Sequence, residues 1–196
     1  QANVAYGFWP ANSEKNDIIL YKNERRAGEL TRFNMLRQRK IRNGIALSLS
    51  DFIAPVDSKI KDYIGAFAVT AGINAEELSI EYEKNNNDYN SIMIKTIADR
   101  LAEALAELMH QRVRKEWGFP DDKNITNEDL IKEKYQGIRP AFGYPACPNH
   151  EEKEKLFRIL EAEKIGMKLT ENYSMTPAAS VSGLYFANKK AKYFSI

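Results

Sequence analysis

The segment that most constrains the fold is residues 88–118, DYNSIMIKTIADRLAEALAELMHQRVRKEWG, which has no proline and no glycine before its last position. A periodic run of this length can only be accommodated by a fold built around one long helix. Its periodicity predicts a helix of about 25 residues. The side chains that recur at helical spacing form an apolar stripe of the kind that usually faces a core: Met93, Ile97, Leu101, Ala104 and Leu108.

The rest of the chain reads as a mixture of strands and helices. Strands are predicted at 17–22, 44–55 and 62–73, and the tail beyond 167 alternates like further strands. Helices are predicted at 24–42, 74–84, 125–137 and 149–166. These elements do not alternate as regular βαβ units. The order therefore favours an α+β fold with a largely antiparallel sheet.

Composition excludes several classes of protein. The chain has 196 residues, which fits one large domain or a piece of a larger protein. Its 29 basic and 27 acidic residues give a net charge of +2, so no global field indicates nucleic acid or membrane as a partner. Neither a membrane-spanning stretch nor a signal peptide is recognisable. A single cysteine fits a reducing compartment, and we expect a cytoplasmic protein.

Two local features have weak functional readings. The basic run 37–42 could bind phosphates, but without interleaved aromatic residues a solvated helix end is the better interpretation. Cys147 and His150 form half of a possible zinc site, and the other histidine lies far away in the long helix. A nucleophilic Cys147 would need a base that lowers its pKa. We therefore expect no metal and no catalytic thiol, and no glycine-rich nucleotide motif is present.

Residues 139–153, RPAFGYPACPNHEEK, predict a rigid loop, because three prolines fix φ and Gly143 permits a positive φ. Arg139 at its start is either a loop-bracing residue or a fork that grips a carboxylate. On the long helix, Asp99, Glu103 and Glu107 share one face. They form either a solvated acidic stripe, whose charge the nearby Lys95 and Arg100 balance, or a surface for a cationic ligand. A zwitterion such as an amino acid would satisfy both functional readings.

Two aromatic pairs near the C-terminus, Tyr185–Phe186 and Tyr193–Phe194, remain open between two roles. Strand core is the default interpretation. A ring placed over a sulfonium or a purine is the alternative. Residue chemistry alone leads to an α+β domain that binds a zwitterionic small molecule.

The same segments resemble the activation domain of cobalamin-dependent methionine synthase, whose hallmark R-x-x-x-G-Y matches Arg139, Gly143 and Tyr144. Six blocks follow the family pattern in order, across essentially the whole chain: YGFWPANSE, DYIGAFAVTAG, DYNSIMIKTIADRLAEALAE, GIRPAFGYPACP, LTENYSMTPAASVSGLYF and AKYFSI. The resemblance implies a curved, helmet-like α+β domain that binds S-adenosylmethionine. It further implies reductive methylation of inactive cob(II)alamin, which reactivates a methyltransferase of methionine biosynthesis.

The family's ligand contacts map onto eight residues: Glu103, Arg139, Pro140, Ala141, Gly143, Tyr144, Tyr193 and Phe194. In this resemblance Arg139 grips the ligand's carboxylate and Glu103 lies near the ligand. Asp99 falls where the family's helix meets the cobalamin domain. The implied partners are that cobalamin-binding domain and a flavodoxin-type or flavoprotein reductant.

The resemblance also implies that the chain, 1–196, is the C-terminal part of the family's domain. A preceding portion of that domain carries an acidic ligand contact. The cobalamin-binding loop and the zinc site for homocysteine belong to other domains of the parent enzyme. A truncated or diverged binding domain that has lost the ligand is the alternative function.

Overall fold

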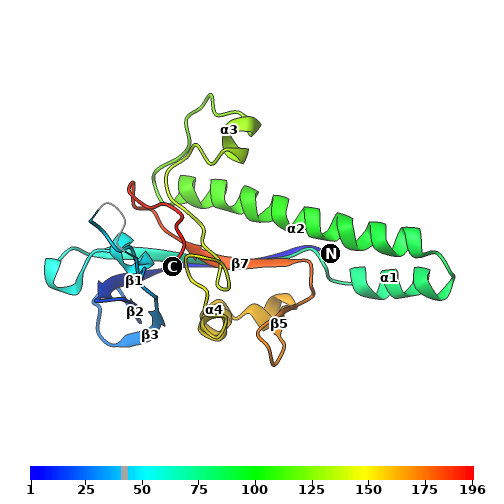
Figure 1. The fold of residues 1–196 in the computed structure, drawn as a ribbon, viewed down its shortest axis with the longest axis horizontal. Coiled ribbons are helices and arrows are strands. Elements are labelled where there is room, and N and C mark those ends of the chain that lie inside the picture. Colours follow the sequence, from blue (N-terminus) through cyan, green and yellow to red (C-terminus); the bar gives the residue numbers. More distant parts are fainter. Residues whose placement is uncertain (41–43) are drawn as a thin grey trace.

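The computed structural model describes residues 1–40 and 44–196 and contains a five-stranded antiparallel sheet with helices on both faces (Figure 1). The strand order is β3-β2-β1-β4-β7, with every pairing antiparallel. The bounds are β1 Asn3–Glu14, β2 Asp17–Tyr21, β3 Glu29–Asn34, β4 Asp62–Thr70 and β7 Ser180–Tyr185. A small ribbon pairs β5 Lys168–Leu169 with β6 Met175–Thr176. The predicted α+β class and antiparallel sheet are confirmed.

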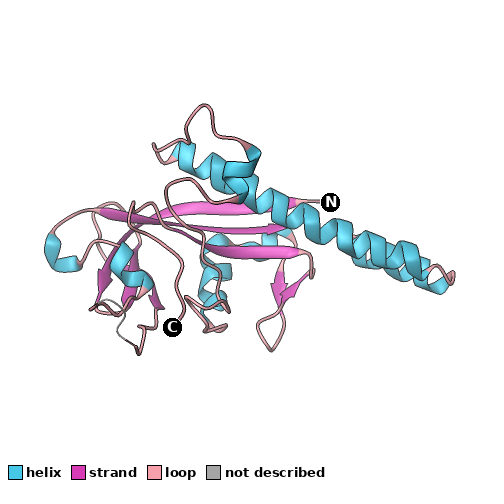
Figure 2. Cartoon of the chain, turned by 45° about the horizontal axis from the view of Figure 1, so that its top comes forward, coloured by secondary structure: helices cyan, strands magenta, loops and turns pink. Residues whose placement is uncertain are grey.

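Helices cover the sheet from two sides (Figures 1 and 2). The bounds are α1 Ala75–Lys84, α2 Asp88–Glu116, α3 Asn127–Ile131 and α4 Glu152–Leu160, with 3-10 helices at Leu49–Phe52, Val56–Ser58 and Ala162–Ile165. The long helix α2 lies along one face with α1 beside it, and α4 lies on the opposite face. Among the described residues, no helix is both long and apolar enough to cross a membrane.

Strand β4 is buried on both faces because the two helical layers enclose it. Alternate side chains of a strand point to opposite faces. Ile64, Ala66 and Ala68 accordingly join the core beneath α4, whereas Phe67 and Val69 pack beneath α2. This explains why the strand reads as a continuous apolar run rather than an alternating one, and the sequence prediction of a strand here is confirmed.

The prediction that the apolar stripe of the long helix faces the core is wrong, although the helix itself is confirmed. Met93, Ile97, Leu101 and Leu108 are 37% to 59% exposed. The face that meets the sheet instead carries mostly small residues: Ala98, Ala102, Ala106 and Met109, all 5% exposed or less. The buried side chains of α2 are therefore small from Ser91 to Ala106 and larger toward the C-terminal end, where Met109, His110, Val113 and Arg114 are buried.

Two N-terminal predictions are also wrong. The segment 24–42, predicted as a helix, contains strand β3, which pairs with β2 along its length. The last two residues of this prediction, 41 and 42, lie outside the described residues. The segment 44–55, predicted as a strand, contains a 3-10 helix that Ser48 and Asp51 cap reciprocally. In both places the tertiary pairing or the local cap outweighs the apolar spacing.

The described part of the basic run, residues 37–40, is not helical, and residues 41 and 42 of the run lie outside the described residues. Arg37 precedes the undescribed residues and donates from Nη2 to Asp51 Oδ1 at 2.6 Å. Its guanidinium also donates to the carbonyl oxygen of Ala46 at 2.7 Å. Arg37 thus ties two loop segments together, which is a structural role.

The two C-terminal helical predictions are confirmed as helices, but α3 begins at Asn127 and α4 at Glu152, and both end earlier than predicted. The Thr126–Asp129 capping box exists, but α3 stops at Ile131. The segment 149–166 divides into α4 and a 3-10 helix, because Glu161 adopts a left-handed conformation with φ of 49°.

Candidate ligand site

The loop that carries the hallmark residues Arg139, Gly143 and Tyr144, called the hallmark loop below, begins as an extension of the sheet. Ile138 and Phe186 exchange two backbone hydrogen bonds of 3.1 and 3.0 Å, and the Leu184 amide donates to the Pro140 carbonyl at 3.0 Å. Strand β7 is the edge of the sheet on this side. Residues 138–140 therefore occupy the open edge, so the sheet fixes the backbone of Arg139.

After this extension the chain folds into a tight turn. The Gly143 amide donates to the Cys147 carbonyl at 2.9 Å, and the Cys147 amide donates to the Tyr144 carbonyl at 3.0 Å. The Cys147 thiol donates to the Ala141 carbonyl at 3.0 Å and is buried. Burial raises the pKa of Cys147 to about 12, so the thiol stays protonated and packs the turn. Among the described residues, no group of three metal-ligating side chains is found at this turn or elsewhere.

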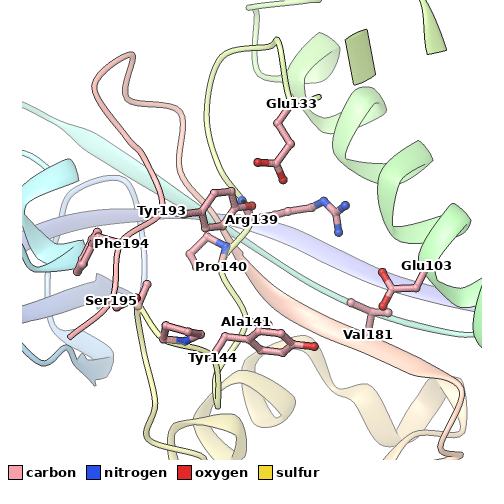
Figure 3. Close-up of a pocket in the computed structure, with 12 residues that line it drawn as sticks. Glu103, Glu133, Arg139, Pro140, Ala141, Tyr144, Val181, Tyr193, Phe194 and Ser195 are labelled. Carbon is pink, nitrogen blue, oxygen red and sulfur yellow. Dashed lines mark hydrogen bonds between the residues drawn. The ribbon is translucent and has the colours of Figure 1, made fainter. Parts of the chain in front are cut away.

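This turn, α2 and the C-terminal segment enclose a cavity of about 470 Å³ (Figure 3). That volume is within the range of small-molecule sites. The lining combines charged, aromatic and small side chains: Glu103, Glu133, Arg139, Pro140, Ala141, Tyr144, Pro145, Ala146, Val181, Tyr193, Phe194 and Ser195. Segments far apart in the sequence thus converge on one cavity.

Seven of the eight residues expected to contact a ligand line this cavity; Gly143 does not. Gly143 instead faces His150, whose ring lies against its Cα. Asp99 belongs to a separate cavity of about 240 Å³, which it lines together with Lys95 and Glu76. Asp99 and Glu103 therefore line different cavities.

Arg139 is anchored at both its backbone and its side chain. Its amide donates to Tyr193 Oη at 3.1 Å, and its Nη2 donates to Glu107 Oε2 at 2.7 Å. Burial lowers the pKa of Arg139, but the charge and hydrogen bond of Glu107 outweigh that effect and raise it overall. The guanidinium is therefore a permanent cation at the cavity wall.

The cavity also has acidic groups. Figure 3 shows the carboxylates of Glu103 and Glu133 on the same side of the cavity as the Arg139 guanidinium. Sequence reasoning missed Glu133, because the segment was predicted to be helical. It lies beyond α3 with φ of 53°, a conformation that its sequence does not signal. A ligand in this cavity would meet one cation and two carboxylates.

Behind Arg139, a buried layer of aromatic and cationic side chains supports the wall. Arg114 is fully buried, pairs with Asp121 at 2.7 Å through Nη2, and stacks over the Tyr135 ring at 3.7 Å. His110 stacks on Tyr185 with centroids 5.1 Å apart. Burial, followed by the charges of Arg114 and Arg139, lowers the pKa of His110 to about 2.

The structure shows where the side chains near the acidic stripe and in the two aromatic pairs lie. Lys95 was expected to balance the charge of the acidic stripe on its own helix. Its Nζ instead lies 2.9 Å from Oε1 of Glu83 on α1. Tyr185 and Phe186 are each 1% exposed and belong to the core. Tyr193 is 44% exposed and lines the cavity.

The chain matches the family model described as vitamin B12 dependent methionine synthase, activation domain, over residues 1–196. It is also similar to the structure described as the MetH reactivation domain bound to AdoHcy, with 49% sequence identity and a TM-score of 0.96. The similarity covers 99% of this chain and 61% of that chain. This chain therefore belongs to the activation-domain family of vitamin B12-dependent methionine synthase.

Proposed function

We propose that this chain binds S-adenosylmethionine in the 470 Å³ cavity and presents its methyl group for the reductive methylation of cob(II)alamin. The observation that carries the proposal is the placement of Arg139, Glu103 and Glu133 around one cavity. Family membership supports it, as does the AdoHcy (S-adenosylhomocysteine) of the similar structure.

The lining residues fit the chemistry of this ligand. Its carboxylate requires a cationic donor, which Arg139 supplies. Its ammonium and sulfonium are cationic, and carboxylates stabilise such charges; Glu103 and Glu133 are placed to do so. Its adenine requires an apolar or aromatic surface, and Tyr144, Tyr193 and Phe194 offer one.

Each group of residues has a distinct task in this proposal. Arg139 orients the amino-acid end, and the aromatic residues hold the adenosyl end. The Pro140 carbonyl accepts a hydrogen bond from the Leu184 amide, which keeps the backbone next to Arg139 in place. Bound S-adenosylmethionine supplies an electrophilic methyl group, whereas the cobalamin and the reducing electron come from outside this chain.

The remaining parts of the reaction belong to the whole enzyme and are included here as proposals. The chain spans 61% of the length of the similar reactivation domain, and the rest of that domain would complete the ligand site. Asp99, on its separate cavity, would face the cobalamin-binding domain. A flavodoxin-type or flavoprotein reductant would deliver the electron in the cytoplasm, and zinc would bind only in the homocysteine domain of this methyltransferase.

Calorimetric titration of S-adenosylmethionine and AdoHcy into the chain tests the proposal. We expect both ligands to bind. Arg139→Ala should weaken binding by about 2–4 kcal/mol, because the ligand's carboxylate loses its charged partner. Wild-type protein that is folded but binds neither ligand would favour the alternative of a structural domain that has lost its ligand.

A further inference from the structure

The ion pair between Arg139 and Glu107 joins the hallmark loop to the long helix. Arg139 Nη2 and Glu107 Oε2 are 2.7 Å apart, and their side chains are only 18% and 28% exposed. Among the described residues, Glu107 provides the one carboxylate that hydrogen-bonds Arg139. The two acids that line the cavity, Glu103 and Glu133, make no such bond within that part of the chain.

Both ends of this pair are held by rigid elements. Glu107 lies on α2 beside Ala106, which is completely buried against the sheet. Arg139 follows Ile138, whose two backbone bonds fix it to Phe186 at the sheet edge. The pair therefore connects the guanidinium both to α2 and to the sheet edge, two elements that pack against each other.

The pairing uses only part of each group. Glu107 Oε1 and Arg139 Nε are buried and lack a hydrogen-bond partner among residues 1–40 and 44–196. One carboxylate oxygen and one terminal nitrogen make the contact. This arrangement uses one of the two Nη2 donors. Within residues 1–40 and 44–196 Nη1 makes no hydrogen bond, so both of its donors can serve a ligand.

We propose that Glu107 is a positioning residue for ligand recognition: it orients the Arg139 guanidinium so that Nη1 is presented to the ligand's carboxylate. The inference rests on the proposed function, since it concerns the same cavity. It refines the expectation of a fork that grips a carboxylate, because one guanidinium donor already has a protein partner. Glu107 is not part of the hallmark motif, because it lies 32 positions before Arg139 in the chain.

A pair of ligands isolates the effect. S-adenosylmethionine and decarboxylated S-adenosylmethionine share the sulfonium, the amine and the adenosyl group and differ in the carboxylate. Positioning of Arg139 should affect only the ligand that has the carboxylate. Glu107→Ala removes the acceptor for Nη2, whereas Glu107→Gln keeps a neutral acceptor oxygen of the same length.

The experiment measures both ligands by calorimetry with wild type, Glu107→Ala, Glu107→Gln and the control Glu116→Gln. Glu116 lies on the same helix and pairs with Arg112, away from the cavity. We expect Glu107→Ala to weaken S-adenosylmethionine binding about tenfold. A loss of this size corresponds to one charge-assisted hydrogen bond between Arg139 and the ligand's carboxylate. Glu107→Gln should recover most of this loss. The control, and all affinities for the decarboxylated ligand, should stay unchanged.

Other outcomes overturn the inference. Unchanged or tighter binding by Glu107→Ala would mean that Glu107 is a bystander or competes with the ligand for Arg139. Equal losses for both ligands would indicate general damage to the site, which urea unfolding of each variant would also reveal. A wild-type chain that binds neither ligand would contradict the proposed function itself, whereas normal wild-type binding with an indifferent Glu107→Ala variant would refute the positioning role alone.

Discussion

The imidazole ring of His150 occupies the space that a Cβ atom on Gly143 would need. Both ring nitrogens would lie 2.7 Å from such an atom, closer than real Cβ contacts allow. Gly143 also has φ of +95°, a conformation that side chains disfavour. The positive φ favours glycine here, and the ring of the exposed His150 would have to shift to admit a Cβ atom, although Gly143 does not line the cavity itself.

Gly143→Ala should destabilise the fold by about 2–4 kcal/mol, the sum of left-handed strain and overpacking. Adding His150→Ala to this variant should remove the overpacking but keep the strain. Urea unfolding of the two single variants and the double variant measures each part. Additive effects in this cycle would show that the His150 ring does not cause the cost.

Stability should depend on the neutral state of His110. Its pKa is lowered to about 2 in the folded chain and is 6.5 when unperturbed, so protonation favours the unfolded state. The contribution of His110 is fully present above pH 6.5 and is lost as the pH falls below that value. The loss should approach about 1.4 kcal/mol per pH unit.

His110→Phe supplies the control for this pH dependence. Phenylalanine can stack on Tyr185 and meet Tyr135 edge-on as the imidazole does, but it does not titrate. The free energy of unfolding of the variant should fall less steeply between pH 6.5 and 4.5 than that of the wild type. Parallel curves would show that His110 is not the group responsible.

The buried face of α2 can be tested by two neighbouring residues. Ala102 is 1% exposed and Leu101 is 56% exposed. Ala102→Leu should cost about 1–3 kcal/mol, because extra methylenes must fit between helix and sheet. Leu101→Gln should change the free energy of unfolding by less than about 0.5 kcal/mol. Urea unfolding measures both changes. A larger loss for Leu101→Gln than for Ala102→Leu would mean that the apolar stripe predicted from the sequence is the buried face.

The elements that could be predicted from sequence are those whose local signals agree with their tertiary surroundings. Strand β4 and helix α2 are long and strongly patterned, and both were predicted. Strand β3 was not, since its pairing with β2 is a property of the fold and its apolar residues fall near helical spacing. In the site, Glu103 and Arg139 were identified from sequence. Glu107 was placed on the correct helical face, but nothing local shows that a loop 32 residues later returns to it.

Glu103 and Asp99 lie one turn apart on α2 but open onto different cavities, which makes their roles separable. Glu103→Gln removes a negative charge beside the proposed cationic end of the ligand and should weaken S-adenosylmethionine binding about three- to tenfold. AdoHcy, which lacks the sulfonium charge, should lose less affinity. Calorimetry with both ligands measures this difference.

Asp99→Asn is the matched change on the same helix. It should leave both affinities unchanged in the isolated chain, because Asp99 does not line the ligand cavity. In the whole enzyme it should slow reactivation by weakening the docking of the cobalamin domain, a shift between conformations rather than a loss of ligand. A merely solvated acidic stripe makes the opposite forecast: both substitutions would relieve like-charge repulsion and raise the melting temperature slightly. Two such gains with unchanged affinities would assign this face of α2 to the surface alone.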